Sequence, residues 1–262
     1  MISCDKFSFS YGTKEVLRDV NFTIPKGDFC ALLGLNGSGK STLLKLLAGL
    51  LSTQSGAIFI DQKQIKDYSI KNLSQKIAYV SQRQDIIFDF SVYDIVMMGR
   101  NPYQTHWSVP DAEDERIVAD AIEMCHLSQL QEHTLTQISG GELQRTFIAC
   151  AIAQQAPIIL LDEPLSNLDI IHKFEIMEIL THLNQTQKTT ILISLHDFSV
   201  AKQYAPTSMI LSDGFLTSFG ETSSILKPEV IKENFNLSDQ FMIDDYGNVR
   251  KKCEVSKTFG EP

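Results

Sequence analysis

Apolar and polar residues alternate in two short stretches near the amino end of the chain. Residues 7–11 and 20–24 each place an apolar side chain at every second position, and turn-forming residues follow at Gly12 and at 25–28. Alternation with a period of two is typical of a strand with one buried face. These stretches therefore predict an antiparallel sheet that leads into the apolar run 29–33.

Later runs rich in aliphatic and β-branched residues predict further strands. The most apolar of them, 158–161, has the pattern of a strand buried on both faces of a parallel sheet. The other predicted strands lie at residues 56–61, 77–82 and 189–196, and a strand followed by a turn lies at 209–214.

Between about residues 83 and 155 the spacing becomes helical. Apolar residues recur every three or four positions from 111 to 129, with charged residues between them. Asp111 follows a proline and is a suitable residue to cap the start of this helix. We predict a helical sub-domain over about 83–155, inserted into one domain that spans 1–247. A polar, loosely ordered tail would follow at 248–262.

The segment between the predicted strand 29–33 and the helix-patterned run 43–50 carries the clearest chemistry. It matches the phosphate-binding loop pattern, in which four residues separate a glycine from Gly-Lys-Ser. Glycines allow backbone N–H groups to face the phosphates, Lys40 adds a positive charge, and Ser41 offers a hydroxyl to Mg²⁺. The predicted nucleoside triphosphate site comprises Gly34, Leu35, Asn36, Gly37, Ser38, Gly39, Lys40, Ser41 and Thr42.

Polar residues end three of the predicted core strands. Because ligands of α/β sheets bind at the carboxyl ends of strands, Gln82 is placed to reach Mg²⁺ or water. Asp162 suits the coordination shell of Mg²⁺, and Glu163 can orient or deprotonate a water. His196 ends the next strand. Taken singly, a glutamine or histidine in such a place is more often a surface residue, and adjacent acids are commonly just solvated.

Two further motifs each allow a structural and a functional interpretation. Tyr11 is either a sheet-edge aromatic or a platform on which an adenine ring stacks. Ser139, Gly140, Gly141 and Glu142 begin a helix that runs to about residue 155. They form either a second phosphate-sized concavity of N–H groups or an ordinary capping box, in which Glu142 partners Ser139.

Composition and charge narrow the range of function classes that fit this chain. The chain has 262 residues, of which 43% are hydrophobic, and a net charge of −9. No apolar run approaches the ~20 residues of a membrane-spanning helix, and the amino end is too polar for a secretory signal. Beyond residues 250–252 there is no basic cluster of the kind that a nucleic-acid partner requires. The five scattered cysteines indicate reduced thiols in a cytosolic protein.

Taken in order, these motifs resemble those of the ATP-binding subunit of ABC transporters, over about residues 2–237. The resemblance implies an α/β P-loop ATPase core with a mainly parallel sheet, an N-terminal antiparallel β sub-domain and an inserted helical sub-domain. The matching positions are Tyr11 for the adenine-stacking aromatic, 34–42 for the phosphate loop, Gln82 for the glutamine loop, 139–142 for the signature, Asp162 and Glu163 for the second carboxylate motif, 166–169 for the following loop and His196 for the switch histidine.

The resemblance also implies a mechanism. Two copies would pack head to tail, with ATP held between residues 34–42 of one and 139–142 of the other. Glu163 would act as general base, His196 would bind the γ-phosphate, and Asp169 would communicate across the interface. Mg²⁺ would be bound by Ser41, Gln82 and Asp162. Two positions depart from the family pattern, since Ile138 replaces a leucine and Cys150 stands where an arginine is common.

Residues 92–103 resemble a narrower group within the family. Their Gly-Arg-Asn-Pro stretch is similar to that of subunits that power uptake of iron–siderophore complexes, haem or cobalamin. The resemblance implies an importer with a second copy of this chain, two membrane permease subunits and an external binding protein. The chain would then work at the cytoplasmic face of the membrane. Taken alone, the stretch fits any loop before a helix.

Three alternatives compete with transport. A soluble ABC ATPase that serves iron–sulfur cluster assembly also lacks membrane segments, although the Gly-Arg-Asn-Pro stretch argues against it. A chromosome or DNA-repair ATPase would place a long coiled coil between Lys40 and Asp162, and this interval is too short for one. A non-catalytic regulatory module is disfavoured because every catalytic position is filled.

Overall fold

The computed structural model of the protein describes residues 1–82, 88–104, 109–235, 241–244 and 247–251. Within them, an antiparallel sheet has the order β2-β1-β4-β5. Its register pairs Ile2 with Ile24 and with Ile60, which confirms the antiparallel sheet predicted at the amino end. The strands are β1 (Ile2–Tyr11), β2 (Lys14–Ile24), β4 (Ser55–Ile60) and β5 (Lys63–Gln64).

The second sheet is mainly parallel and has the order β10-β9-β3-β8-β7-β6. The five strands from β9 to β6 are parallel to one another, and β10 is antiparallel to β9 at the edge. The carboxyl ends of β6, β7 and β8 therefore meet at one side of the sheet. The strands are β3 (Phe29–Leu33), β6 (Ile77–Val80), β7 (Ile158–Leu161), β8 (Thr190–Ser194), β9 (Thr207–Ser212) and β10 (Phe215–Glu221).

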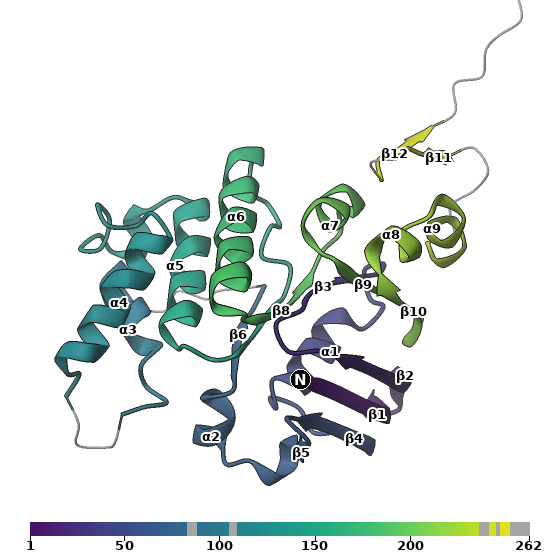
Figure 1. The fold of residues 1–262 in the computed structure, drawn as a ribbon, viewed down its shortest axis with the longest axis horizontal. Coiled ribbons are helices and arrows are strands. Elements are labelled where there is room, and N and C mark those ends of the chain that lie inside the picture. The colour runs from purple at the N-terminus through teal and green to yellow at the C-terminus, as the bar shows by residue number, and fades with distance from the viewer. Residues whose placement is uncertain (83–87, 105–108, 236–240, 245–246, 252–262) are drawn as a thin grey trace, which may run out of the picture.

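Helices connect these strands and cover the parallel sheet. The helices are α1 (Lys40–Leu47), η1 (Ile65–Asp67), α2 (Ile70–Ser74), α3 (Val92–Met98), α4 (Ala112–Met124), η2 (Leu135–Gln137), α5 (Gly140–Ala153), α6 (Ile170–Gln187), α7 (Phe198–Tyr204), α8 (Thr222–Ile225) and α9 (Pro228–Asn234). Figure 1 shows α3, α4 and α5 at one end of the molecule and the antiparallel sheet toward the other.

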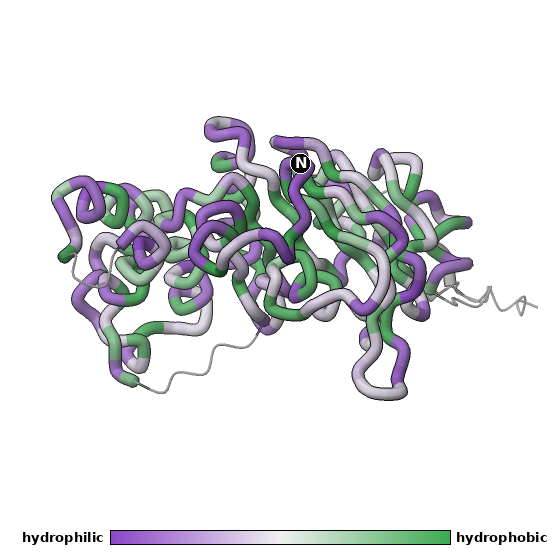
Figure 2. The backbone as a smooth tube through the Cα atoms, turned by 90° about the horizontal axis from the view of Figure 1, so that it is seen from below, coloured by the Kyte–Doolittle hydropathy of each residue, from purple (hydrophilic) through white to green (hydrophobic). Residues whose placement is uncertain are grey.

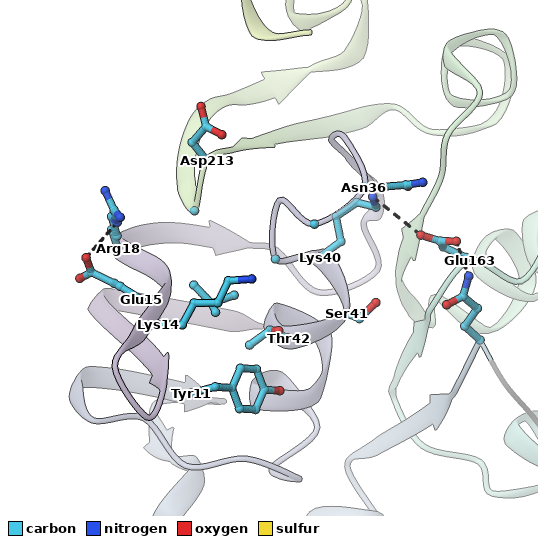
Figure 3. A pocket seen from close by; sticks show the side chains of 15 residues that line it. Tyr11, Lys14, Glu15, Arg18, Asn36, Lys40, Ser41, Thr42, Glu163 and Asp213 are labelled. Atoms are coloured by element: carbon cyan, nitrogen blue, oxygen red, sulfur yellow. Dashed lines mark hydrogen bonds and ion pairs between the residues drawn. The ribbon is translucent and has the colours of Figure 1, made fainter.

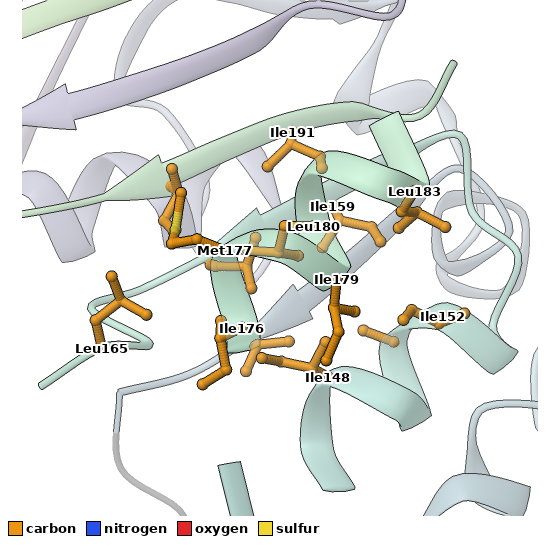
Figure 4. Packing of buried hydrophobic residues seen from close by; sticks show 14 of the residues in the cluster. Ile148, Ile152, Ile159, Leu165, Ile176, Met177, Ile179, Leu180, Leu183 and Ile191 are labelled. Carbon is orange, nitrogen blue, oxygen red and sulfur yellow. The ribbon is translucent and has the colours of Figure 1, made fainter. Parts of the chain in front are cut away.

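The parallel sheet separates two hydrophobic cores, and the side chains of β3 alternate between them. Phe29, Ala31 and Leu33 face a core shared with α4, α5, α6 and α7. Figure 4 shows how α5 and α6 pack there, with Ile148 and Ile179 near each other. Strand β3 is thus buried on both faces, as its continuous apolar run predicts.

The other core holds α1 between the two sheets. Leu43, Leu44, Leu46 and Leu47 are each no more than 1% exposed. Burial of a leucine side chain contributes about 1.5–3 kcal/mol, so these contacts fix the start of α1 at the end of β3. The loop that precedes Lys40 is therefore anchored on a rigid support.

The helix predicted at 111–129 is confirmed, although it is shorter than predicted. Asp111 caps α4 by accepting hydrogen bonds from the backbone N–H groups of Glu113 and Asp114. The helix ends at Met124 because the chain turns into a left-handed conformation at His126, with φ of 56°. Helices α3, α4 and α5 all lie between β6 and β7 in the chain. The bounds of a sub-domain at about 83–155 remain a prediction, and residues 83–87 lie outside the described residues.

The Gly-Arg-Asn-Pro stretch has a structural role that its sequence did not indicate. Arg100 is buried, and its guanidinium donates to Asp114 Oδ1 at 2.7 Å and to the carbonyl oxygen of Ala153 at 2.8 Å. The guanidinium also lies over the ring of Tyr103, 4.2 Å from its centroid. Arg100 therefore ties the end of α3 to the start of α4 and the end of α5.

The strongly polar carboxyl end is only partly described. A hairpin of β11 (Phe241–Ile243) and β12 (Val249–Lys251) spans the predicted boundary at 247, and β12 lies at the start of the predicted tail. The remainder of that tail, 252–262, lies outside the described residues, so its predicted loose order is not tested. The boundary at 247 also remains a prediction.

Hydrophobic segments gather in the middle of the molecule. Figure 2 shows them in green, with hydrophilic segments mainly along the outer edges. Across the described residues, none of the helices combines the length and the apolar character needed to cross a bilayer. Cys4, Cys30, Cys125 and Cys150 are free thiols. Cys150 packs against the hydrophobic core, and burial raises its pKa to about 11, which disfavours the thiolate.

Candidate nucleotide site

A cavity of about 690 Å³ opens where α1 begins, and its size lies in the range of ligand pockets in proteins. Residues of the phosphate loop form much of its wall, and Figure 3 shows Tyr11 and Glu163 toward opposite sides of it. The lining residues are Tyr11, Lys14, Glu15, Val16, Arg18, Asn36, Gly37, Gly39, Lys40, Ser41, Thr42, Gln82, Glu163, Asp213 and Gly214.

Lys40 closes the phosphate loop on itself. Its ammonium donates to the carbonyl oxygens of Gly34 and Leu35 at 3.0 and 3.2 Å, and it lies 3.7 Å from Glu163 Oε1. The side chain is only 4% exposed. Burial lowers the pKa of Lys40, an effect that the negative charges of Glu163 and Asp162 oppose. A phosphate group would supply further negative charge at this place.

The loop leaves hydrogen-bond donors without partners. A Cβ on Gly34 would overlap the carbonyl oxygen of Leu211 and would lie 2.6 Å from Ser38 Oγ, so this position requires glycine. Ser38 Oγ is buried and has no hydrogen-bond partner among the described residues. Gly39 stands at the N-cap of α1, which no side chain caps. This open helix start, with its positive dipole end, is a suitable anion site.

Asp162 lies beneath the loop at the end of β7 and is 2% exposed. Its Oδ1 accepts hydrogen bonds from the hydroxyls of Ser41 at 3.0 Å and Ser194 at 3.1 Å. Its Oδ2 accepts a longer one, of 3.4 Å, from Tyr79. Burial, and to a lesser extent Asp162, raise the pKa of Tyr79. A hydroxyl and a carboxylate in contact are oxygen donors of the kind that Mg²⁺ prefers, so the residues present fit this ion.

Three of the predicted site residues lie close to the carboxylate of Glu163. Its Oε2 accepts from Gln82 Nε2 at 2.6 Å, and its Oε1 lies 2.7 Å from His196 Nε2 and 3.7 Å from the ammonium of Lys40. The side chains of Asp162 and Glu163 contact different partners, and the alternation of side chains along a strand does not explain this difference. Strand β7 ends at Leu161, and Glu163 has a left-handed backbone with φ of 49°.

Gln82 contacts Glu163, whereas the hydroxyl of Ser41 contacts Asp162. Gln82 and His196 therefore surround the predicted general base. Their roles toward Mg²⁺ and the γ-phosphate remain predictions.

The serine and glycine turn before α5 has the geometry of a capping box. Ser139 Oγ accepts from the backbone N–H of Glu142 at 3.3 Å, and Glu142 Oε2 accepts from the backbone N–H of Ser139 at 2.7 Å. The second of these bonds lowers the pKa of Glu142. The four residues 139–142 are absent from the described lining of the cavity. Within one chain, the structural interpretation of this turn is therefore sufficient.

Asp169 also caps a helix. Its Oδ1 accepts from the backbone N–H of His172 at 2.9 Å at the start of α6. The ring of His172 lies so close to Gly141 that a Cβ there would overlap it. This contact connects the loop at 166–169 with the turn at 139–142, although the two are far from each other in the sequence.

Tyr11 lines the cavity at the end of β1 and is 49% exposed. Its ring packs edge-on against Phe9, with 4.9 Å between the centroids. The exposed face of the ring is available to a base, so both interpretations of Tyr11 stay open.

Sequence reasoning missed several residues that line or support the site. Lys14 and Arg18 reach the cavity from β2, and Asp213 reaches it from the turn after β9. Burial does not alternate along residues 14–18, and Glu15 lines the cavity as well, so strand periodicity would not have identified Lys14 and Arg18. Ser194 and Tyr79 contact Asp162. The position of Ser194 at the carboxyl end of β8 is a signal that could have identified it, whereas Tyr79 lies within an apolar strand and carries no such signal.

A phosphate loop between β3 and α1, with two carboxylates after the parallel strand β7, defines a P-loop nucleotide-binding protein. Comparisons with known proteins identify the family. Residues 17–166 match the model of the ABC transporter family. The chain is 32% identical to the iron(3+)-hydroxamate import ATP-binding protein FhuC of Bacillus subtilis (strain 168), over 94% of this chain and 92% of that protein.

Solved structures agree with this match. A chain from a metal-chelate type ABC transporter in an inward-facing conformation has a TM-score of 0.82 and 30% identity, covering 97% of this chain and 98% of that one. A dimeric, post-hydrolysis ATP-binding cassette, MJ0796, bound to ADP and Pi, has a TM-score of 0.74 and 27% identity, covering 85% and 99%.

The chain therefore belongs to the ABC transporter family, as one of its ATP-binding, ATP-hydrolysing cassettes. The predicted α/β fold class and the predicted ATPase class are confirmed.

Proposed function

We propose that the chain is the ATPase subunit of an ABC importer, which powers uptake of an iron–siderophore, haem or cobalamin-type substrate through separate permease subunits. One observation supports the catalytic part most strongly. Lys40, Gln82 and His196 converge on Glu163 at the edge of a nucleotide-sized cavity. This arrangement is suited to a carboxylate that takes a proton from water beside a triphosphate.

The residues of the loop would bind the triphosphate. Lys40, the open start of α1 and the unpartnered hydroxyl of Ser38 face negative charge with donors already in place. Ser41 and Asp162, with Gln82 from the glutamine loop, would hold Mg²⁺. When bound, this ion neutralises charge on the phosphate oxygens.

Glu163 would act as the general base. The side chain of His196 is 44% exposed and contacts Glu163, and it would bind the γ-phosphate from beside this carboxylate. Gln82 holds the second oxygen of the same carboxylate. Together they would orient Glu163 toward water and limit its rotation.

A second copy of the chain would complete the site. Residues 139–142 present a capped helix start away from the cavity of their own chain, and a partner packed head to tail would bring them to the nucleotide. Asp169 lies on the loop that contacts this turn through His172. The dimeric state of the similar cassette MJ0796 supports this arrangement.

The substrate class rests on two likenesses. FhuC is named for iron(3+)-hydroxamate import, and the similar solved structure is of the metal-chelate type. The proposed partners are two membrane permease subunits and, indirectly, an external binding protein. The chain would lie at the cytoplasmic face of the membrane, and no nucleic acid is proposed as a partner.

Hydrolysis is tested with Glu163→Gln. The variant should still bind ATP but lose ~10²–10⁴-fold in turnover, because the amide cannot accept a proton from water. Steady-state hydrolysis and equilibrium binding of a fluorescent ATP analogue measure the two properties. Glu113→Gln, an exposed change on α4, serves as the control. Near-normal turnover of Glu163→Gln would refute the role of general base.

Transport is tested by purification of the tagged chain from membranes. The expected result is a complex with a permease subunit, whose reconstitution into vesicles gives ATP-dependent uptake of one labelled substrate from ferric siderophores, haem and cobalamin. Capture of iron–sulfur scaffold proteins without any membrane subunit would refute the importer and favour the alternative ATPase.

A further inference from the structure

A buried hydroxyl at the end of β8 has no part in the mechanism described so far. Ser194 is 0% exposed. Its Oγ accepts the backbone N–H of Glu163 at 2.7 Å and donates to Asp162 Oδ1 at 3.1 Å. A serine hydroxyl has a single proton, so this group can donate to only one of its neighbours at a time. The N–H of Glu163 can only donate, and the carboxylate of Asp162 can only accept. The oxygen of Ser194 therefore accepts from Glu163, and its proton is donated to Asp162.

The register of the parallel sheet places this hydroxyl between the two carboxylate residues. Ile193 pairs with Leu161 across β8 and β7, so Ser194 lies beside Asp162, the first residue after the end of β7. Strand β3 holds β8 from the other side, where Leu32 pairs with Ser194. The hydroxyl thus comes from the centre of the sheet, where backbone movement is most restricted.

The other two contacts of Asp162 are less suited to hold it in place. Ser41 lies on the first turn of α1, within the cavity lining, where a bound nucleotide would compete for its hydroxyl. Tyr79 contacts the opposite oxygen at the longer distance of 3.4 Å. Of the three hydroxyls, that of Ser194 is the one that is fully buried and also absent from the lining of the nucleotide-sized cavity.

Ser194 also restrains the backbone of Glu163. That residue has φ of 49°, a left-handed conformation that residues other than glycine rarely adopt. Such a conformation persists only where the surrounding structure holds it. The bond from the Glu163 N–H to Ser194 is one such restraint, and the bond from Ser166 Oγ to the carbonyl oxygen of Glu163, at 2.8 Å, is a second.

We propose that Ser194 is a positioning residue for ATP hydrolysis, which fixes the side chain of Asp162 and the backbone of Glu163 relative to each other through one hydroxyl. The inference rests on the proposed roles of Asp162 and Glu163. A competing role is purely structural, since any buried hydroxyl that accepts an N–H contributes to stability. The two roles differ in what they predict for kcat and for the requirement for Mg²⁺.

The same strand offers a matched control. Thr190, at the other end of β8, is 2% exposed, and its Oγ1 accepts the backbone N–H of Gly27 at 2.9 Å. It is thus a second buried hydroxyl that accepts a backbone N–H, but it lies at the amino ends of the strands, away from the cavity. Thr190→Val removes that hydroxyl and keeps the shape of the side chain.

The experiment uses the full-length chain and compares Ser194→Ala, Ser194→Cys and Thr190→Val with the native protein. Tm, kcat, KM for ATP and the Mg²⁺ concentration for half-maximal rate are measured. Binding of a fluorescent ATP analogue is titrated with Mg²⁺ and with EDTA. Loss of a group that orients a metal ligand typically costs about 10–100-fold in activity or metal affinity.

We expect Ser194→Ala to lower kcat and raise the half-maximal Mg²⁺ concentration, each by about 10-fold or more, with KM for ATP and binding in EDTA close to native. Thr190→Val should lower Tm with kcat and the Mg²⁺ requirement unchanged. Ser194→Cys, which is nearly isosteric and a weaker hydrogen-bonding group, should lie between native and Ser194→Ala. If Ser194→Ala does not fold, the comparison of Ser194→Cys with Thr190→Val decides.

Native kcat and Mg²⁺ requirement in a folded Ser194 variant would overturn the proposal, as would an equal loss of kcat in Thr190→Val. The proposed function fails separately, if Glu163→Gln hydrolyses ATP normally. Normal hydrolysis by Ser194→Ala together with inactive Glu163→Gln would remove only the inference about Ser194.

Discussion

Two helix starts, those of α1 and α5, follow short loops of glycine and serine, yet their hydrogen bonding is opposite. At α1 the N-cap is Gly39, no side chain caps the helix, and the first turn has no acidic residue. At α5 the N-cap is Ser139, and a complete capping box uses the carboxylate of Glu142. The first helix start is open, and the second is satisfied by its own side chains.

The two helix starts therefore differ in which groups can accept hydrogen bonds from their first N–H groups. The first N–H groups of a helix need acceptors, and a phosphate can supply them where side chains do not. The start of α1 is therefore open to an anionic ligand, with a buried ammonium at Lys40 and a Ser38 hydroxyl that has no hydrogen-bond partner among the described residues. The start of α5 is stable without a ligand, and its proposed contact with nucleotide depends on a second chain.

The largest expected effect is the loss of ATP hydrolysis, without loss of ATP binding, when the start of α5 is changed. Ser139→Arg should abolish ATP hydrolysis and leave ATP binding by the single chain unchanged, because residues 139–142 do not line its cavity. Hydrolysis rates and binding of a fluorescent ATP analogue test this. Ser139→Thr, which keeps a capping hydroxyl, is the control and should hydrolyse ATP. If Ser139→Arg lost binding in the single chain, the shared-site arrangement would be wrong.

The next effect concerns the open helix start. Lys40→Ala should weaken ATP binding by about 2–5 kcal/mol, which corresponds to ~30-fold or more in Kd. The reason is that the triphosphate loses a buried charge that the loop already holds in place. Calorimetric titration with ATP measures the loss. Lys45→Ala on the same helix, outside the cavity lining, should bind ATP normally; an equal loss in both variants would indicate a general defect of α1.

A smaller effect tests the closed helix start. Ser139→Ala should lower the free energy of unfolding by about 0.5–2 kcal/mol, because the capping hydrogen bond to Glu142 is lost. Ser91→Ala, which removes the same kind of capping box at α3, should cost a similar amount without affecting hydrolysis. Denaturant titration provides both values. Unchanged stability of Ser139→Ala would show that the closed start does not depend on its cap.

The smallest effect is a pH dependence at the open helix start. Because the pKa of Lys40 is lowered from 10.5, the unfolded chain holds more protons than the ligand-free folded chain between the lowered value and 10.5. Stability from this group therefore rises with pH through that window. Lys40→Met should be more stable than the native chain at pH 7, with the difference shrinking toward pH 10. A difference in unfolding free energy that grows with pH would contradict this.

The sequence contained most of the local structure of the site. The phosphate loop, the strand before it, Asp111 as a helix cap and the capping box at 139–142 all follow from residues within about five positions of one another. Such features depend on local backbone preferences and short-range hydrogen bonds, so pattern is sufficient to predict them.

Helix α6 shows where pattern failed. Its first turns expose Ile170, Ile171 and Phe174, whereas later residues such as Leu180 and Leu183 are buried. Because α6 has apolar residues on both faces, its sequence shows no clear helical periodicity of hydrophobic positions. Only the packing of α6 against α5 and the sheet determines which face is buried.

Sequence alone determined that this chain binds a nucleoside triphosphate, because the loop that grips phosphates is continuous in the chain. Tertiary structure decided which residues surround the carboxylates. Gln82, His196 and Lys40 meet at Glu163, and Ser194 meets Asp162, only because parallel pairing aligns the ends of β3, β6, β7 and β8. Contacts between residues 30 to 120 positions apart depend on sheet register and core packing, which no local pattern encodes.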